Sequence, residues 1–270
     1  MRAQSEYKEE QGVGFFVFPD WERLPFVTHF FSTRKGGNSK GSCATLNLDF
    51  RDGDTKKAVS ENRKLVCDAL GVDRDIHFVE QIHGDGIHLL TSRNLGKSST
   101  TPVRADAILT DLKDVPIGVL TADCVPILLL DSGTRAIGVV HAGRKGTEKK
   151  ILSKTISKMI EQFNIQVEDL FVGIGPSIGQ CCYEVGQECL VPFQKNPLLA
   201  KQAIRQVETG KFYLDLIQLN VFQLLEFHIP NQNIYYLDVC TACRTDLFYS
   251  HRGENSQTGR FVSGLFLRSK

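Results

Sequence analysis

The sequence predicts an α+β fold with mixed or antiparallel β-sheets and helices packed on the outer faces of those sheets. Apolar runs of strand length occur in groups, and segments with helical periodicity cluster between these groups instead of alternating with single strands. No Gly-x-Gly-x-x-Gly motif follows the first predicted strand, so nothing favours a dinucleotide-binding fold. The 270 residues could fill one large domain or two small ones, and no linker or repeat divides them.

The first part of the chain predicts two strands and a helix. Residues 14–18 and 26–32 are rich in Phe and Val and are bounded by turn residues, which is typical of strands. The glycines and polar residues at 36–39 predict a turn or mobile loop. Apolar side chains at helical spacing predict a helix over 57–70, which Gly71 ends.

The middle of the chain predicts a hairpin and three apolar strands. A Gly-Asp-Gly turn separates two short strands, at 77–82 and 86–90, and a polar Ser/Thr loop follows at 95–103. Apolar runs then predict strands at 105–110, 117–130 and 136–141. Because proline cannot donate a hydrogen bond to a neighbouring strand, Pro126 predicts that the second of these runs is an edge strand or carries a bulge.

The last part of the chain predicts most of the helices. Residues 146–163 place Ile151, Ile156 and Met159 along one helical stripe, and residues 170–175 predict a strand. Further helices are predicted at 184–193, 197–208 and 215–227, and further strands at 234–237, 246–250 and 261–267.

Charge and hydropathy exclude several classes of partner. The net charge of +1 gives no whole-molecule field that would attract nucleic acid or an anionic membrane. The basic run at 144–154 is interrupted by Glu148 and is typical of a solvated helix face. Residues 1–11 lack the apolar core of a signal peptide, and the longest apolar run, 124–130, is too short to span a bilayer. We therefore predict a cytoplasmic protein with neither a nucleic acid nor a membrane as partner.

The cysteine pattern does not predict a disulfide framework. Eight cysteines in a cytosolic chain of this length are expected to be reduced, buried or metal-binding. Cys181 and Cys182 are adjacent, and we do not expect them to chelate one metal together. Cys240 and Cys243 form a Cys-x-x-Cys without a second such motif, which predicts reduced, structural cysteines, with a redox or zinc pair as the alternative.

Three residues are the best candidates for chemistry. His83, Cys124 and His141 each lie in a short, glycine-punctuated segment at the end of a predicted buried strand. Two imidazoles and a thiolate are good ligands for a tetrahedral zinc ion, and three ligands leave a fourth position open for catalysis. Taken singly, each residue could instead be a hydrogen-bonded histidine or an inert buried thiol. If the three converge, they predict a metalloenzyme with zinc as cofactor, and copper could bind the same ligands in vitro.

Neighbours of these residues predict supporting roles. Side chains alternate along a strand, so Asp123 cannot point the same way as Cys124, and we expect it to support the site from behind instead of binding the metal. Arg144 and Lys145 follow His141 at a predicted helix start, where an anion such as phosphate is favoured. The alternative is that both cations are simply solvated.

Taken together, these segments resemble the laccase-domain family, whose members are called multicopper polyphenol oxidases, purine nucleoside phosphorylases and peptidoglycan editing factors. The matching stretches run in order along nearly the whole chain, at 31–34, 46–48, 61–63, 81–84, 105–107, 121–126, 141–143, 175–179, 182–186 and 258–260. Thr-Ala-Asp-Cys at 121–124 and Gly-Pro-Ser-Ile-Gly at 175–179 are the most distinctive.

The resemblance implies a single domain over residues 1–270 and a metal site in a cleft at strand ends, between the sheets. The zinc ligands of the family correspond to His83, Cys124 and His141, the residues already selected for their ligand chemistry. The implied activity is phosphorolysis of purine nucleosides (adenosine, inosine and methylthioadenosine) with phosphate, together with deamination of adenosine.

Substrate contacts follow from this resemblance. We expect Arg34, Arg63 or Lys145 to hold phosphate and Asn47 to hold a ribose hydroxyl, although an isolated Asn is also typical of a turn or cap. Tyr183 and Glu184 are expected near the pocket. Where the family usually has Trp-Arg after His-Ala-Gly, this chain has Arg144 and Lys145, and Lys does not reproduce the bidentate geometry of Arg on phosphate.

Three other functions stay open from the sequence. Cys124 and His141 could act as nucleophile and base in a cysteine-type hydrolase that edits peptidoglycan precursors. A copper polyphenol oxidase is less favoured, because the seven histidines include no His-x-His pair. The third is a zinc-stabilised interaction module without enzymatic activity. The sequence leaves the oligomeric state open.

Overall fold

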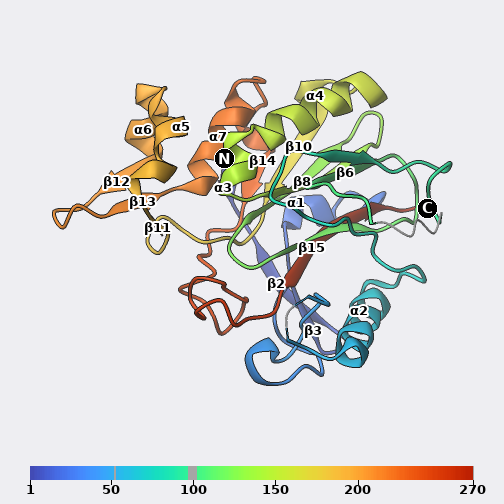
Figure 1. Ribbon diagram of the computed structural model, residues 1–270. Coiled ribbons are helices and arrows are strands. Elements are labelled where there is room, and N and C mark those ends of the chain that lie inside the picture. The colour runs from blue at the N-terminus through green and yellow to red at the C-terminus, as the bar shows by residue number, and fades with distance from the viewer. Residues whose placement is uncertain (52, 97–101, 270) are drawn as a thin grey trace.

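The computed structural model describes residues 1–51, 53–96 and 102–269, in which two β-sheets face each other (Figure 1). The seven-stranded sheet has the order β1 (Arg2–Ala3), β14 (Ile234–Tyr236), β10 (Leu170–Ile174), β8 (Val125–Asp131), β9 (Ile137–Ala142), β6 (Ala107–Thr110), β5 (Ile87–Leu89). The five-stranded sheet has the order β2 (Glu6–Glu10), β3 (Val13–Val17), β4 (Val27–Ser32), β15 (Phe261–Leu267), β7 (Ile117–Thr121).

Alternation along β8 explains how the layers pack. Leu128 and Leu130 belong to the core between the two sheets, where they meet Val119 of the other sheet. Ile127 and Leu129 point to the opposite face, into the core that the helices cover. β8 is therefore apolar on both faces and fully buried, as a strand in the middle of a layered fold must be.

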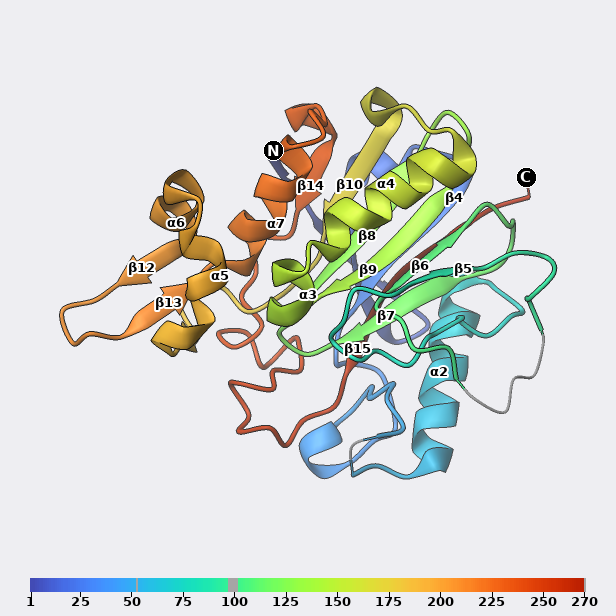
Figure 2. The same ribbon diagram turned by 45° about the horizontal axis from the view of Figure 1, so that its top comes forward.

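Helices cover the outer faces of both sheets. α3 (Arg144–Glu148), α4 (Ile151–Phe163) and α7 (Leu216–Leu225) lie over the seven-stranded sheet (Figure 2). α2 (Lys56–Leu70) packs on the five-stranded sheet; Thr55 caps its first turn and Gly71, at φ 67°, ends it. The remaining elements are α1 (Pro19–Glu22), α5 (Val191–Gln194), α6 (Pro197–Ala203) and a small sheet of β11 (Glu184–Val185), β13 (Phe212–Leu214) and β12 (Ile204–Gln206).

This architecture confirms the predicted α+β fold with helices on the outer faces of its sheets. The predicted strands at 26–32 and 261–267 and the helix at 57–70 form within one residue of their expected bounds. Across residues 1–51, 53–96 and 102–269, no helix is long and apolar enough to cross a membrane.

Several strand predictions were wrong. The hairpin at 77–82 and 86–90 does not form: β5 pairs in parallel with β6, while His77 and Glu80 make only isolated bridges. The run at 117–130 divides into β7 and β8, which join different sheets. Pro126 lies near the start of β8, a central strand, because its carbonyl still accepts the Gly175 N–H and a strand start tolerates the missing donor.

Helix predictions failed where the backbone turns. The helix expected at 146–163 breaks into α3 and α4 at Lys150, which adopts the left-handed conformation at φ 59°. Residues 184–193 form β11, a 3₁₀ turn and α5 instead of one helix, and 197–208 is helical only to Ala203 before β12 begins. Residues 246–250 form the end of a turn, a bend and irregular backbone, although Phe248 and Tyr249 are buried as in a strand. Most of the loop expected at 95–103 falls on residues 97–101, outside the described part of the chain.

Candidate metal centre

His83, Cys124 and His141 come together at one end of the sheets. Their ligand atoms all lie within 4.8 Å of one another, and the two imidazole rings meet edge to face with centroids 4.8 Å apart. His141 comes from the end of β9, Cys124 from the turn between β7 and β8, and His83 from the loop that precedes β5. Three segments distant in sequence thus present two nitrogen ligands and one sulfur ligand to one point.

The turn that carries Cys124 connects the two large sheets. β7 ends at Thr121 in the five-stranded sheet and β8 begins at Val125 in the seven-stranded sheet. Asp123 turns the chain with φ at 92°, a conformation that is strained for a residue other than glycine. Its carboxylate accepts hydrogen bonds from Thr241 Oγ1 (2.7 Å), Ser250 Oγ (2.6 Å) and the backbone N–H of Arg252 (2.6 Å). Asp123 therefore stabilises the turn, while the neighbouring Cys124 thiol faces the two histidines.

The buried carboxylate of Asp106 organises both histidines. It accepts hydrogen bonds from the backbone N–H groups of Ile82 (3.3 Å), His83 (2.9 Å) and Gly84 (2.7 Å). The same carboxylate lies 2.8 Å from His141 Nδ1. This contact leaves Nε2 as the ring nitrogen of His141 that can bind a ligand, which is the usual arrangement behind a metal-bound histidine. Asp106 lies within a stretch that carries the family resemblance, but no role for it was predicted.

Two further residues allow the three ligands to approach. The side-chain amide of Gln81 exchanges two hydrogen bonds of 2.8 Å with the backbone of Leu120, which anchors the His83 loop to β7. Gly143 follows β9 directly beside the cluster. A Cβ atom at position 143 would lie 2.9 Å from Cys124 Sγ and 3.2 Å from His83 Cδ2, so only glycine fits there without displacing a ligand.

The electrostatics of the cluster favour an ionised thiol. Burial alone would raise the pKa of Cys124, but the adjacent His141 and His83 imidazoles lower this pKa to about 6. Burial would likewise lower the pKa of His141, but the Cys124 thiolate and the Asp106 carboxylate raise it to about 9. The site thus stabilises a thiolate beside a positive charge. A metal cation bound by the thiolate would stabilise its negative charge in the same way.

The donor set fits a metal ion. Thiolate sulfur and imidazole nitrogen are preferred ligands of zinc and of copper. His83 is exposed, Cys124 is half-buried and His141 is buried, so the cluster is closed by protein on one side and faces the cavity on the other. Three protein ligands with one open side are typical of catalytic metal sites.

A cavity of about 550 Å³ opens in front of the cluster. Its wall includes the three ligands, the apolar side chain of Ile82 and the ring of Tyr183. The wall is also rich in cations, contributed by Arg51, Arg144, Lys145, Arg252 and Arg260. Arg252 donates a 2.6 Å hydrogen bond to the Glu184 carbonyl and lies over the Tyr183 ring, which fixes one side of the cavity.

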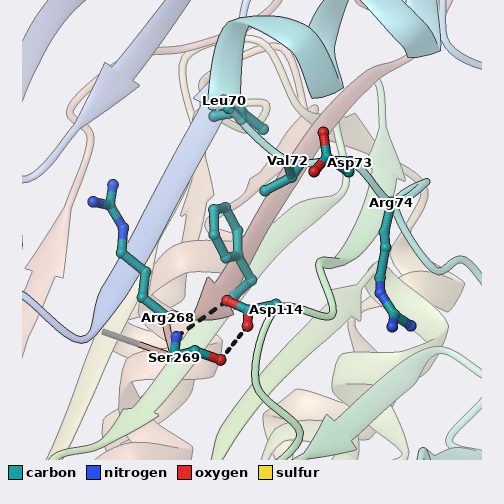
Figure 3. Close-up of a pocket in the computed structure, with 9 residues that line it drawn as sticks. Leu70, Val72, Asp73, Arg74, Asp114, Arg268 and Ser269 are labelled. Carbon is teal, nitrogen blue, oxygen red and sulfur yellow. Dashed lines mark hydrogen bonds between the residues drawn. The ribbon is translucent and has the colours of Figure 1, made fainter.

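A larger hollow lies away from the cluster, and its wall contains none of the three candidate ligands. It measures about 770 Å³ and lies at the other end of β15, where Leu70, Val72, Asp114 and Arg268 line it (Figure 3). Asp114 points to Ser269 and accepts its hydrogen bonds, while Arg268 extends away from Asp114 (Figure 3). The Nε of Arg268 donates to the Thr28 hydroxyl.

Among the four residues expected to hold phosphate or ribose, one lines the cavity; Tyr183, expected near the pocket, also lines it. The one is Lys145, whereas Arg34, Asn47 and Arg63 lie outside the cavity wall. Arg34 donates to the Ala44 and Thr245 carbonyls and to Glu254. Arg63 donates to the Leu48 carbonyl and its guanidinium lies 4.4 Å from the centres of two Phe rings.

Asn47 is fully buried and also serves the fold. Its amide donates to Asp54 and to the Asp49 carbonyl, and its oxygen accepts the backbone N–H of Arg260, so it holds a cavity residue in place without touching the cavity. Contact of Arg34, Asn47 or Arg63 with a substrate in this cavity is therefore not supported. The sequence analysis did not predict the cavity cations Arg51, Arg252 and Arg260, although Arg260 lies in the matching stretch Thr-Gly-Arg at 258–260.

Comparison with known proteins shows the family of this chain. Residues 28–268 match the family described as multi-copper polyphenol oxidoreductase laccase. A purine nucleoside phosphorylase from Bacteroides thetaiotaomicron is 33% identical over 247 residues, covering 89% of this chain and 92% of its own length. The adenosine deaminase RL5, from an unknown prokaryotic organism, is 31% identical and covers 89% of this chain and 94% of its own length.

Solved structures show the same fold. YlmD from Geobacillus stearothermophilus superposes with a TM-score of 0.87 at 30% identity, covering 98% of this chain and 100% of its own. The hypothetical protein YfiH from Bacillus licheniformis superposes with a TM-score of 0.89 at 31% identity, covering 97% of this chain and 99% of its own. This chain therefore belongs to the multi-copper polyphenol oxidoreductase laccase family.

Proposed function

We propose that this protein is a zinc-dependent purine nucleoside phosphorylase that also deaminates adenosine. One observation carries the proposal: the cluster of His83, Cys124 and His141 lies in the wall of a cavity that is otherwise rich in cations. The cations suit a phosphate dianion, and a volume of about 550 Å³ suits a nucleoside with phosphate. Relatives named purine nucleoside phosphorylase and adenosine deaminase support the same activities.

His83, Cys124 and His141 would hold the zinc ion, which supplies Lewis-acid chemistry when bound. Asp106 keeps the His141 proton on Nδ1 and thereby presents Nε2 as the ligand atom. Lys145, Arg252 and Arg260 neutralise phosphate and orient one of its oxygens toward the anomeric carbon of ribose. The bond from that carbon to the purine nitrogen breaks as the new carbon–oxygen bond forms. Ile82 and the ring of Tyr183 offer apolar surface for the base.

The direct test is the release of base. Zinc-loaded protein given inosine and phosphate should form hypoxanthine and ribose 1-phosphate, and release should require phosphate. Lys145→Ala should raise KM for phosphate by about tenfold or more, because the variant loses a cation from the cavity wall. Lys149→Ala, an exposed lysine on the same segment but outside the cavity wall, is the matched control. Protein with zinc bound that releases no base would overturn the proposal.

A cysteine-type hydrolase acting on peptidoglycan precursors is the second candidate. It is favoured by the lowered pKa of Cys124, about 6, beside the raised pKa of His141, about 9, which is the pairing that activates a thiol nucleophile. A copper polyphenol oxidase is less favoured, because in the described part of the chain the groups suited to a metal include only two histidines, His83 and His141.

Chelation and alkylation separate the two candidates. We expect a chelator to abolish nucleoside phosphorolysis and added zinc to restore it. If metal-free protein hydrolyses a peptidoglycan precursor and iodoacetamide abolishes this hydrolysis, the result would favour the cysteine-type hydrolase. If copper but not zinc restored phosphorolysis, the cofactor would be copper and the proposed reaction would stand.

A further inference from the structure

A second group of metal-ligand side chains lies apart from the cavity ligands. The sulfur atoms of Cys181, Cys182, Cys240 and Cys243 all lie within 4.8 Å of one another. The sulfur of Cys243 is 3.4 Å from that of Cys182 and 3.7 Å from that of Cys181. We did not expect the adjacent Cys181 and Cys182 to chelate one metal together, but both sulfurs point to the same centre as the Cys-x-x-Cys pair.

Two turns face each other to build this cluster. A parallel bridge joins Ser177 to Cys240, and the N–H of Thr241 donates to the Ser177 carbonyl at 3.0 Å. One turn is closed by a 3.0 Å hydrogen bond from the Cys182 N–H to the Gly179 carbonyl. The other is closed by a 3.0 Å hydrogen bond from the Arg244 N–H to the Cys240 carbonyl. These backbone hydrogen bonds therefore bring Cys182 and Cys240 close together, although 57 residues separate them in the sequence.

Gly179 allows the turns to approach. A Cβ atom at this position would lie 3.2 Å from both the Cys181 sulfur and the Cys240 Cβ. Its N–H also donates to the Cys240 sulfur at 3.2 Å, and an N–H donor at this distance stabilises a thiolate. The loop is thus shaped around the sulfur atoms.

The distances suit one ion better than a disulfide. Sulfurs bound to a tetrahedral zinc ion, with Zn–S bonds of about 2.3 Å, lie about 3.8 Å apart. Disulfide sulfurs lie about 2.05 Å apart. A cluster of several iron atoms would hold its cysteines further apart than one ion does. We propose that Cys181, Cys182, Cys240 and Cys243 form a second zinc site, closed by four thiolates and therefore structural.

This site would fix the wall of the catalytic cavity from behind. Thr241, inside the Cys-x-x-Cys, donates to the Asp123 carboxylate at 2.7 Å, and the Ile178 N–H donates to the Asp123 carbonyl at 2.9 Å. Both turns of the cluster thus contact the residue that precedes Cys124. Tyr183, in the cavity wall, directly follows Cys182. The four-cysteine site is distinct from the cavity ligands, and its metal content is measurable whatever the protein catalyses.

Metal stoichiometry tests the inference. Full-length protein loaded with zinc under reducing conditions should contain about two zinc ions per chain, one for each site. Cys181→Ser and Cys243→Ser should each lose about one of them, and His83→Ala should lose the other. Cys189→Ser is the matched control, since Cys189 is nearby in sequence but outside the cluster, and it should keep both.

X-ray absorption at the zinc edge keeps the test independent of folding defects in the serine variants. In His83→Ala, which leaves the four cysteines intact, the remaining zinc should have four sulfur neighbours at about 2.3 Å. Zinc content that falls to none in His83→Ala would overturn the inference. So would a disulfide between any two of the four cysteines in protein purified with zinc and reductant, or iron as the bound metal.

Discussion

At the scale of single residues, Asp106 connects two ligands that are far apart in sequence. Its carboxylate binds three consecutive backbone N–H groups around His83 and the Nδ1 of His141. Burial opposes its ionisation, but these hydrogen bonds and the His141 charge outweigh burial and lower the pKa of Asp106. One ionised side chain therefore fixes both the loop position of His83 and the ring orientation of His141.

Replacing this carboxylate should loosen the metal. Asp106→Asn puts an NH₂ group where an oxygen now accepts backbone N–H donors, so one of the two carboxylate positions becomes repulsive. We expect metal affinity to fall by about 10- to 100-fold, as for other partners behind metal-bound histidines, measured by competition with a chelator. Asp85→Asn, on the same loop but paired with exposed lysines, is the control. Equal affinity in both variants would contradict this role for Asp106.

The candidate ligands could be found from the sequence because His and Cys carry their chemistry in the side chain itself. Partners that act through contacts could not be found in this way. Asp106 lies 35 residues from His141, and nothing local marks their contact. The phosphate contacts expected of Arg34 and Arg63 stay predictions, and the structure gives them no support, because both side chains donate to backbone carbonyls outside the cavity wall.

At the scale of elements, the side chain of Gln81 replaces a strand. Its amide makes the paired N–H and carbonyl hydrogen bonds to Leu120 that a neighbouring strand would make to β7. The pattern at 77–82 predicts a strand, but these residues form only isolated bridges, because the Gln81 side chain makes the hydrogen bonds to β7. The loop runs beside β7 and is fixed to it by a side chain, which leaves its own backbone free to turn at His83.

Removing that amide should weaken the fold. Gln81→Ala leaves the buried N–H and carbonyl of Leu120 without partners, so we expect the free energy of unfolding to fall by about 2 kcal/mol or more. Urea unfolding with an unchanged m value measures this loss. Gln162→Ala, on the exposed face of α4, should stay within about 0.5 kcal/mol of the parent. A Gln81→Ala variant as stable as this control would refute the strand-replacing role.

Regular elements were predictable where apolar periodicity continued uninterrupted. α2 has both an N-cap in Thr55 and a glycine stop, and its bounds were found within one residue. Two of the errors occur where a non-glycine residue reverses the chain, at Asp123 and at Lys150, since a positive φ at these residues leaves no mark in the sequence pattern. The pairing of β15 with both β4 and β7 depends on contacts across most of the chain and was likewise not predictable.

At the scale of the whole molecule, buried His29 links stability to pH. It lies in β4, where its Nε2 accepts the Phe18 N–H at 2.7 Å and its ring stacks on Phe18. Burial, together with the nearby Lys8 charge, lowers its pKa from 6.5 to about 3. The native state therefore holds His29 neutral, whereas the unfolded chain protonates it below about pH 6.5.

The contribution of His29 to stability is fully present above pH 6.5 and is lost as the pH falls from 6.5 toward 3. At pH 5 we expect this residue alone to reduce the free energy of unfolding by about 2 kcal/mol. In His29→Gln, urea unfolding between pH 7 and pH 5 should lose stability less steeply than the parent. The exposed His228→Gln should keep the parent slope. Identical slopes in all three proteins would show that His29 does not control acid sensitivity.

The turn at residues 122–124 has a consequence for how this protein can change in evolution. Most connections between strands tolerate insertions, because an added residue bulges into solvent. Here Thr121 and Val125 are already fixed in different sheets, and Asp123 is bonded to two other segments between them. One added or deleted residue would turn the Cys124 side chain away from the histidines. We therefore expect evolution to tolerate substitutions in the cavity wall, but not insertions or deletions in the turn at residues 122–124.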